Sequence, residues 1–157
     1  MAELRGCQFP ESHLYHPASH LWFVPEGDDL FRVGVTEFGV AIAGEIILFT
    51  AKPPGVRLAA GRSFGLLEAG KTVFPVKTPF DAILVEAHEA LERDGRPMNR
   101  DANGTWLVRL KATDGGIPGC LLGWPAAARA VEAEMHRYRF EHRDDFKPSL
   151  EDRPGGV

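Results

Sequence analysis

The chain has 157 residues, a length that supports one domain with a buried core. Its hydrophobic fraction of 44% and charged fraction of 25% are typical of a globular protein in water. A formal net charge of −4 argues against nucleic acid or an anionic membrane as the main partner, because both attract basic surfaces. The N-terminus lacks the apolar stretch of a signal peptide, and no apolar run reaches the roughly 18 residues of a membrane span. We therefore expect a cytoplasmic protein that does not enter a membrane.

Short strands separated by glycine and proline dominate the first two thirds of the chain. Residues 31–36 alternate between apolar and other positions, which predicts a half-buried strand. A short helix is expected at residues 38–43, before Gly44. Residues 45–50 are nearly all apolar and therefore predict a central strand.

Further strands are expected at regular intervals after this point. Pro75 confines the strand that contains it to an edge or a bulge, because proline donates no hydrogen bond to a ladder. Many short strands joined by tight turns indicate a β-sandwich or a flattened barrel. The expected strands cover residues 63–68, 73–77, 83–88 and 106–111.

The C-terminal part of the chain predicts one helix and a tail. Residues 125–140 begin with Pro125, which suits a first helical turn, and are rich in good helix formers. Val131, Met135 and Tyr138 are spaced to form an apolar stripe facing the sheet. Residues 141–157 are charged and end in Arg-Pro-Gly-Gly-Val. We expect a single domain over residues 1–140 and a flexible tail over residues 141–157.

One turn has the arrangement that a modifying enzyme needs. Strand-like runs flank Ala69-Gly70-Lys71-Thr72, and Gly70 is free to adopt the positive φ of a tight turn. Such a hairpin would present Lys71 to solvent from a stiff base, so that an enzyme could select one amine among several. Turn geometry alone does not distinguish a lysine that is modified from an ordinary surface lysine that only improves solubility.

Around this lysine the chain resembles the H protein of the glycine cleavage system and the wider group of H-like lipoyl carriers. The family's Glu-Ser-x-Lys turn stands here as Glu68-Ala69-Gly70-Lys71. The resemblance covers about residues 20–111 with the spacing intact across the lysine. It is carried further by His20-Leu21-Trp22, Val33-Gly34-Val35-Thr36, Ala43-Gly44-Glu45-Ile46, Pro79, Glu89-Ala90-Leu91, and the run Asn99, Asp101, Gly104, Trp106 and Leu107.

The resemblance implies a fold, a cofactor and a role. The fold is the mainly β lipoyl/biotinyl hammerhead, a flattened barrel of two antiparallel sheets, here with a C-terminal helix. The cofactor is lipoate in amide linkage to Lys71, with Glu68 and Gly70 in the modification turn. Glu68 stands where such carriers often hold an acid that lipoate-attaching enzymes need, although an ordinary strand-end carboxylate would look the same. The chain would be a carrier without catalytic residues of its own, since the sulfur chemistry belongs to the cofactor.

Departures from the family pattern point to a pathway. Val73-Phe74-Pro75-Val76 differs from the Ala-Ser-Asp-Val of typical glycine-cleavage H proteins. It is more similar to the lipoate-binding proteins of sulfur-oxidising prokaryotes, as is the N-terminal Gly-Cys-Gln-Phe-Pro-Glu. This resemblance implies a shuttle in cytoplasmic sulfur oxidation, and Phe74-Pro75 is expected to form an apolar surface that its partners recognise. The implied partners are a lipoate ligase or lipoyl transferase, lipoamide dehydrogenase and a heterodisulfide-reductase-like complex. The alternative is the aminomethyl carrier of glycine cleavage, with glycine decarboxylase and aminomethyltransferase as partners.

Other functional classes fit the sequence less well. A biotin carrier usually places its lysine between methionines, whereas Gly70 and Thr72 flank Lys71. His13, His16 and His20 are close in sequence, but Pro17 interrupts any helix that would align them, so no metal site is expected. His20 is expected to pack beside Trp22.

A thiol enzyme would need Cys7 or Cys120. Cys120 precedes two leucines, an apolar setting that predicts a buried or inert thiol, whereas Cys7 is expected in a flexible arm near Arg5. Cys7 could therefore meet the dithiolane of the cofactor. An unmodified scaffold is the remaining alternative, and the mass of the protein would distinguish it from a carrier.

Overall fold

The structure is a computed structural model that describes residues 1–70 and 72–147. The strands are β1 (Ala2–Leu4), β2 (Cys7–Phe9), β3 (Leu14–His16), β4 (Leu21–Pro25), β5 (Leu30–Val35), β6 (Ile46–Ala51), β7 (Arg57–Leu58), β8 (Ser63–Ala69), β9 (Thr72–Lys77), β10 (Ala82–Ala87) and β11 (Val108–Ala112). The helices are η1 (Pro17–Ser19), α1 (Glu37–Ala43), η2 (Glu89–Glu92), α2 (Pro97–Arg100) and α3 (Ala126–Arg137). None of the helices in the described ranges is long and apolar enough to cross a membrane.

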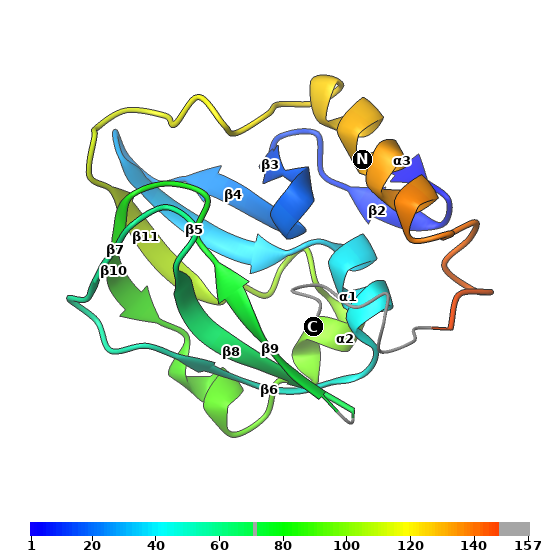
Figure 1. Cartoon of the computed structure of the whole chain (residues 1–157), viewed down its shortest axis with the longest axis horizontal. Helices are drawn as coiled ribbons and strands as arrows, with labels where there is room; N and C mark the ends of the chain where they lie inside the picture. Colours follow the sequence, from blue (N-terminus) through cyan, green and yellow to red (C-terminus); the bar gives the residue numbers. More distant parts are fainter. Residues whose placement is uncertain (71, 148–157) are drawn as a thin grey trace.

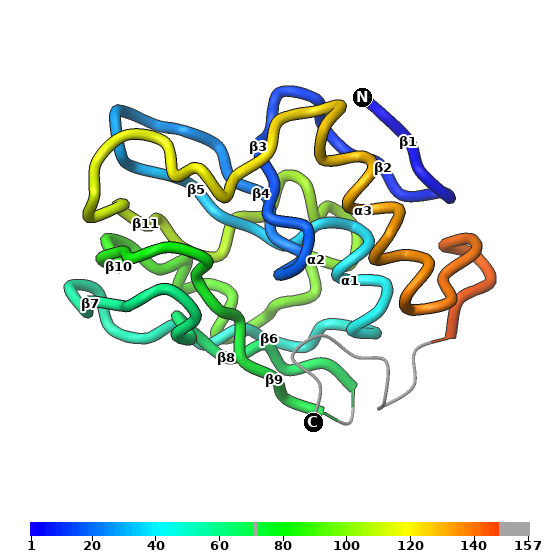
Figure 2. The backbone as a smooth tube through the Cα atoms, turned by 45° about the horizontal axis from the view of Figure 1, so that its top comes forward, coloured from blue at the N-terminus to red at the C-terminus, as the bar shows by residue number. Residues whose placement is uncertain are grey.

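Two antiparallel sheets form the body of the molecule (Figure 1). The larger has six strands in the order β3-β4-β5-β11-β10-β7, and the smaller has three in the order β6-β8-β9. Seen as a tube, β6, β8 and β9 lie below β4 and β5, and the α3 helix covers one end (Figure 2). The predicted mainly β architecture with a C-terminal helix is confirmed.

The main core lies between the sheets and is rich in phenylalanine. Phe31 of β5 is fully buried and packs against Phe23 and Phe80, with ring centroids 6.3 and 5.8 Å apart. Phe64 of β8 contacts Phe49 of β6 at 6.1 Å. Each buried aromatic side chain removes a large apolar area from water, so this cluster holds the three-stranded sheet against the larger one.

A second apolar cluster fixes the α1 and α3 helices beside the six-stranded sheet. Its centre is Trp22, whose indole Nε1 donates a hydrogen bond of 3.0 Å to the carbonyl of Ala102. Gly34, the partner of Trp22 on β5, leaves room for the indole ring, which any Cβ at this position would overlap. The predicted apolar stripe of α3 is confirmed, because Val131, Met135 and Tyr138 are buried in the same cluster. 

The predicted place of β6 in its sheet was wrong. This strand pairs only with β8 and is therefore an edge strand. Its other edge is covered by loop residues instead of a strand: the Gly95 N–H donates to the Ile47 carbonyl at 2.7 Å. The Asn99 side chain bonds both the N–H and the carbonyl of Ile46. That covered edge explains why an edge strand is so apolar.

The side-chain alternation of β10 breaks within the strand. Its pairing with β11 shifts between Leu84 and Glu86, as a β-bulge does. Ala82 and Leu84 are buried, whereas Val85 is exposed. Ile83, Val85 and Ala87, which alternate along the strand expected at residues 83–88, therefore do not form one buried face.

The start of the predicted flexible tail contacts the domain. Arg143 donates to the Glu37 carboxylate of α1 at 2.7 Å, and its backbone N–H donates to the Arg5 carbonyl at 2.9 Å. The Phe146 ring lies 5.0 Å from that of Phe140. Residues 148–157 lie outside the described residues. We propose that the domain extends to about residue 147 instead of residue 140.

Truncation separates the contribution of residues 141–147 from that of the end of the chain. We expect a chain ending after Phe140 to be about 1–2 kcal/mol less stable than one ending after Lys147. The shorter chain loses the partly buried Phe146 ring and the ion pair of Arg143. Urea unfolding of both chains measures the difference. Equal midpoints and slopes would show that the contacts of residues 141–147 add nothing to stability.

Candidate functional site

The β8–β9 hairpin places the predicted modification turn at one end of the molecule (Figure 1). Its register runs from Ser63 opposite Lys77 to Ala69 opposite Thr72. The chain passes from Ala69 to Thr72 through Gly70 and Lys71, and Lys71 itself lies outside the described residues. The short connection requires a special backbone conformation, which Gly70 supplies with a φ of +51°.

The base of this turn is held by β6 and by burial. The Gly70 N–H donates to the Glu45 carbonyl at 3.0 Å, so the turn is hydrogen-bonded to the residue before β6. Ala69 is fully buried, whereas the space around the Gly70 Cα is open. A rigid base with an open tip suits covalent modification, because an enzyme can enclose the tip without unfolding the sheet.

Glu68 lies on the outer face of the hairpin, half-buried, opposite Val73 of β9. The neighbouring outward positions are apolar: Leu66 is 49% exposed and Val73 is 52% exposed. Phe74, which was expected to present an apolar surface with Pro75, is instead 5% exposed and belongs to the main core. The period of two along β9 turns Phe74 inward and Val73 outward, so the expected recognition surface was assigned to the wrong residue.

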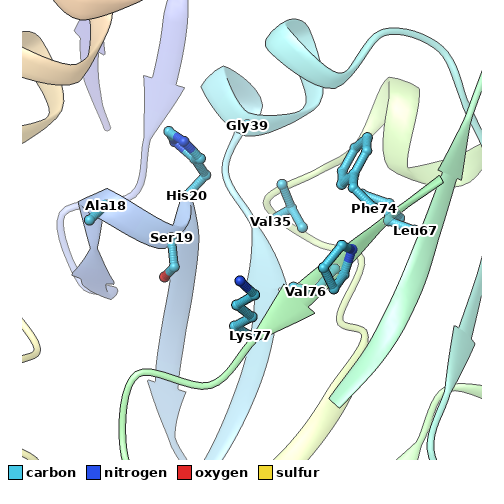
Figure 3. A pocket seen from close by; sticks show the side chains of 10 residues that line it. Ala18, Ser19, His20, Val35, Gly39, Leu67, Phe74, Val76 and Lys77 are labelled. Atoms are coloured by element: carbon cyan, nitrogen blue, oxygen red, sulfur yellow. The ribbon is translucent and has the colours of Figure 1, made fainter. Parts of the chain in front are cut away.

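A pocket of about 210 Å³ lies between β9 and η1 (Figure 3). Its apolar part is formed by side chains from both sheets, and its polar part by Ser19 and Lys77. Sequence reasoning missed this pocket, because nothing in the local pattern shows that η1 faces β9. The lining residues are Ala18, Ser19, His20, Val35, Gly39, Leu67, Phe74, Pro75, Val76 and Lys77.

His20 is a structural histidine in the wall behind this pocket. It is buried, and its ring lies 5.3 Å from Phe38 and 5.6 Å from Tyr138, so it does not pack beside Trp22 as expected. Burial, helped by the charge of Arg137, lowers the pKa of His20 to about 3. Within residues 1–70 and 72–147, no group of histidine, cysteine and acidic side chains is placed to bind a metal ion.

The two cysteines have the opposite settings from those expected. Cys7 is fully buried in β2, where desolvation raises the pKa of its thiol to about 12. Cys120 is exposed, and its sulfur lies 3.7 Å from the Pro79 carbonyl. Partial burial raises the pKa of Cys120 as well. Neither environment favours the thiolate that a nucleophilic enzyme requires.

Comparisons with known proteins agree with this geometry. Residues 14–122 match the family model described as Glycine cleavage H-protein. Glycine cleavage system H protein 5 of Aquifex aeolicus is 36% identical over 116 residues, which are 71% of this chain and 78% of the relative. A probable glycine cleavage system H protein 2 of Sulfolobus acidocaldarius is 30% identical over 69% of this chain and 75% of its own length. The crystal structure of a glycine cleavage system H protein from Mycobacterium marinum superposes with a TM-score of 0.65 and 28% identity, covering 77% of this chain and 97% of that one.

The buried neutral His20 predicts a pH dependence of stability. Its pKa is lowered in the folded chain from 6.5 to about 3, so below about pH 6.5 the unfolded chain takes up a proton that the folded chain excludes. Stability from this site is complete above pH 6.5 and is lost as the pH falls toward 3. Between pH 7 and pH 5 the loss is about 2 kcal/mol.

Urea unfolding of wild type and His20→Asn at both pH values measures this effect. Asparagine tolerates the left-handed backbone of this position, where φ is +60°, and does not titrate. We expect the wild type to lose about 2 kcal/mol more than the variant on acidification. The same loss in both proteins would assign the pH dependence to other groups.

Proposed function

The chain belongs to the glycine cleavage H-protein family, and we propose that Lys71 is the lysine that carries its lipoyl group. Members of this family are non-catalytic carriers with lipoate attached covalently to a lysine. The present chain is accordingly a lipoyl carrier with the lipoyl-domain barrel of that family, not an enzyme. Lys71 is chosen because Ala69 pairs with Thr72, which makes Gly70-Lys71 the link between two paired strands.

Three of the four other lysines have less suitable surroundings. Lys77 and Lys111 belong to strands β9 and β11, and Lys52 follows β6 directly. A ligase that must enclose an extended lysine side chain meets sheet neighbours at these sites. By contrast, the open space around Gly70 and the hydrogen bond from its N–H to Glu45 make the end of β8 both accessible and rigid.

The residues of the chain position the arm and offer its end a place to rest. When attached, lipoate supplies a disulfide that can bind and release the transported group. A lipoyl-lysine arm has about twelve single bonds and extends over about 14 Å. Phe74 is two residues beyond Thr72, or about 7 Å along an extended strand, so the pocket beside β9 is within reach of the arm.

We propose cytoplasmic sulfur oxidation, with a heterodisulfide-reductase-like complex as partner, as the pathway that this carrier serves. The Val73-Phe74-Pro75-Val76 run supports the proposal, since it resembles the corresponding run of sulfur-pathway carriers. A relative from Sulfolobus and two distinct relatives from one Aquifex strain are further support, because one organism with several such carriers can assign them to different pathways. A lipoate ligase or lipoyl transferase would load Lys71, and lipoamide dehydrogenase would reoxidise the arm.

The second candidate is the aminomethyl carrier of the glycine cleavage system. The names of the relatives favour it, as all those cited above are called glycine cleavage system H proteins or probable ones. In that case glycine decarboxylase would load the arm and aminomethyltransferase would unload it. The two candidates share Lys71 and differ in the group that the arm carries.

Lys71→Arg should abolish lipoylation. The protein is produced together with a lipoate ligase and lipoate, and the intact mass of the wild type is expected to show one lipoyl increment. Arginine keeps the charge but has no amine that forms the amide. Lys111→Arg, a matched change in β11, should keep the full increment. A lipoyl increment that persists in Lys71→Arg would refute the assignment.

If the carrier serves sulfur oxidation, the lipoylated protein should support glycine cleavage poorly. The lipoylated protein, supplied with glycine decarboxylase and aminomethyltransferase, should release carbon dioxide from glycine at least about tenfold more slowly than the Mycobacterium marinum H protein. The reason is that the exposed Val73 and the half-buried Pro75 stand beside the turn where typical glycine-cleavage H proteins have alanine and aspartate, and a tenfold rate change corresponds to about 1.4 kcal/mol. Lipoamide dehydrogenase should still reoxidise its reduced arm. Rates equal to those of the Mycobacterium marinum protein would select the glycine alternative.

A further inference from the structure

We propose that Lys77 makes the pocket beside β9 selective for a negatively charged group at the end of the arm. The proposal rests on the lipoyl-carrier function and adds the chemical class of the transported group. It concerns one residue outside the modification turn.

The charge of the pocket supports this selectivity. Lys77 is the charged side chain among the described residues that line it, and none of them is a carboxylate. The ring of His20 adds no charge at neutral pH, since its pKa is lowered to about 3. The remaining wall is mostly apolar, with Val35, Leu67 and Phe74. A transported cation would enter an apolar space beside an ammonium group with no counter-charge to receive it.

The ammonium of Lys77 is placed to act on the end of the arm. In Figure 3 the Lys77 side chain extends from β9 toward η1, where Ser19 lies. Lys77 is exposed, and in the described part of the chain it has no ion-pair or hydrogen-bond partner for its side chain. The Ser19 Oγ lies 2.8 Å from His16 Nδ1. The Ser19 hydroxyl donates to the His16 carbonyl at 3.1 Å, so the ammonium of Lys77, not this hydroxyl, is the donor available to an anion in the pocket.

The arm is long enough to bring its end beside this ammonium. Lys77 is five residues beyond Thr72, or about 17 Å along the strand. The extended arm covers about 14 Å, and the Lys77 side chain extends about 6 Å back into the pocket. An anion on the arm can thus contact the ammonium while the apolar part of the arm lies along Phe74 and Val76.

The inference separates the two candidate pathways by chemistry. The aminomethyl group of glycine cleavage is an amine and is positively charged at neutral pH, whereas oxidised sulfur groups such as a sulfonate are negative. An exposed ammonium discriminates modestly, because solvent screens it. We expect a preference of about threefold, the order of a partly exposed ion pair.

Stable arms of three charges test the inference without any partner enzyme. The lipoylated protein, in a Cys120→Ser background, is reduced and alkylated with iodoacetate, iodoacetamide or 2-bromoethylamine. These reagents give carboxymethyl, carbamidomethyl and aminoethyl groups on the arm sulfurs, which are negative, neutral and positive. Intact mass is read before and after alkylation. The fraction of docked arm is then measured from the NMR shifts of Ser19, Val35 and Val76.

The negative arm should dock about threefold more than the neutral arm, and the positive arm least. Lys77→Gln should remove the difference, while Lys111→Gln, another exposed strand lysine, should leave it unchanged. Pro75→Asp, which adds a carboxylate to the pocket lining, should shift the preference toward the positive arm. Equal docking of the three arms, or best docking of the positive arm in the wild type, overturns the inference.

The readouts distinguish this failure from that of the proposed function. A protein that receives no lipoyl increment on Lys71 fails at the first mass measurement, which refutes the carrier assignment and the inference together. A lipoylated protein whose docking ignores charge refutes the inference alone.

Discussion

The pairing of β8 with β9 is the constraint on which the functional face depends. It sets the modification turn at one end, where Ala69 meets Thr72, and Lys77 at the other, where it meets Ser63. Because side chains alternate along a strand, the same register turns Phe74 and Val76 toward the interior. A slip of one residue would expose this apolar pair and bury Val73 instead. The burial of Phe74 in the main core therefore fixes the base of the hairpin turn and the pocket relative to one another.

The opposite wall of the pocket depends on close packing around α1. Gly39 lies so near Val35 that a Cβ would approach the valine Cγ1 to 2.6 Å and the His20 Cβ to 2.9 Å. Thr36 caps the helix by accepting a hydrogen bond of 3.0 Å from the Gly39 N–H, which sets its direction away from β5. His20, held between Phe38 and Tyr138, links this wall to α3. The second apolar cluster is thus a support for the site as well as a source of stability.

Local patterns in the sequence predicted what depends on neighbouring residues, and missed what depends on contacts across the molecule. The hairpin, the edge position of β9 and the buried stripe of α3 follow from turn residues, Pro75 and helical spacing. The edge position of β6 does not, because its apolar residues are covered by Gly95 and Asn99 from a distant loop. Cys7 was misplaced for the same reason: its burial comes from elements far along the chain.

The site shows the same division between local and distant contacts. The glutamate, glycine and lysine of the turn are close enough in sequence to form a recognisable pattern. By contrast, Ser19 and Lys77 line the same pocket only because η1 and β9 face each other (Figure 3). Among carriers that share a turn and a cofactor, selectivity for the transported group must come from residues that are distant in sequence and line the pocket together. Recognition by the modifying enzyme requires the turn to stay the same, whereas the transported group can change with a few pocket side chains.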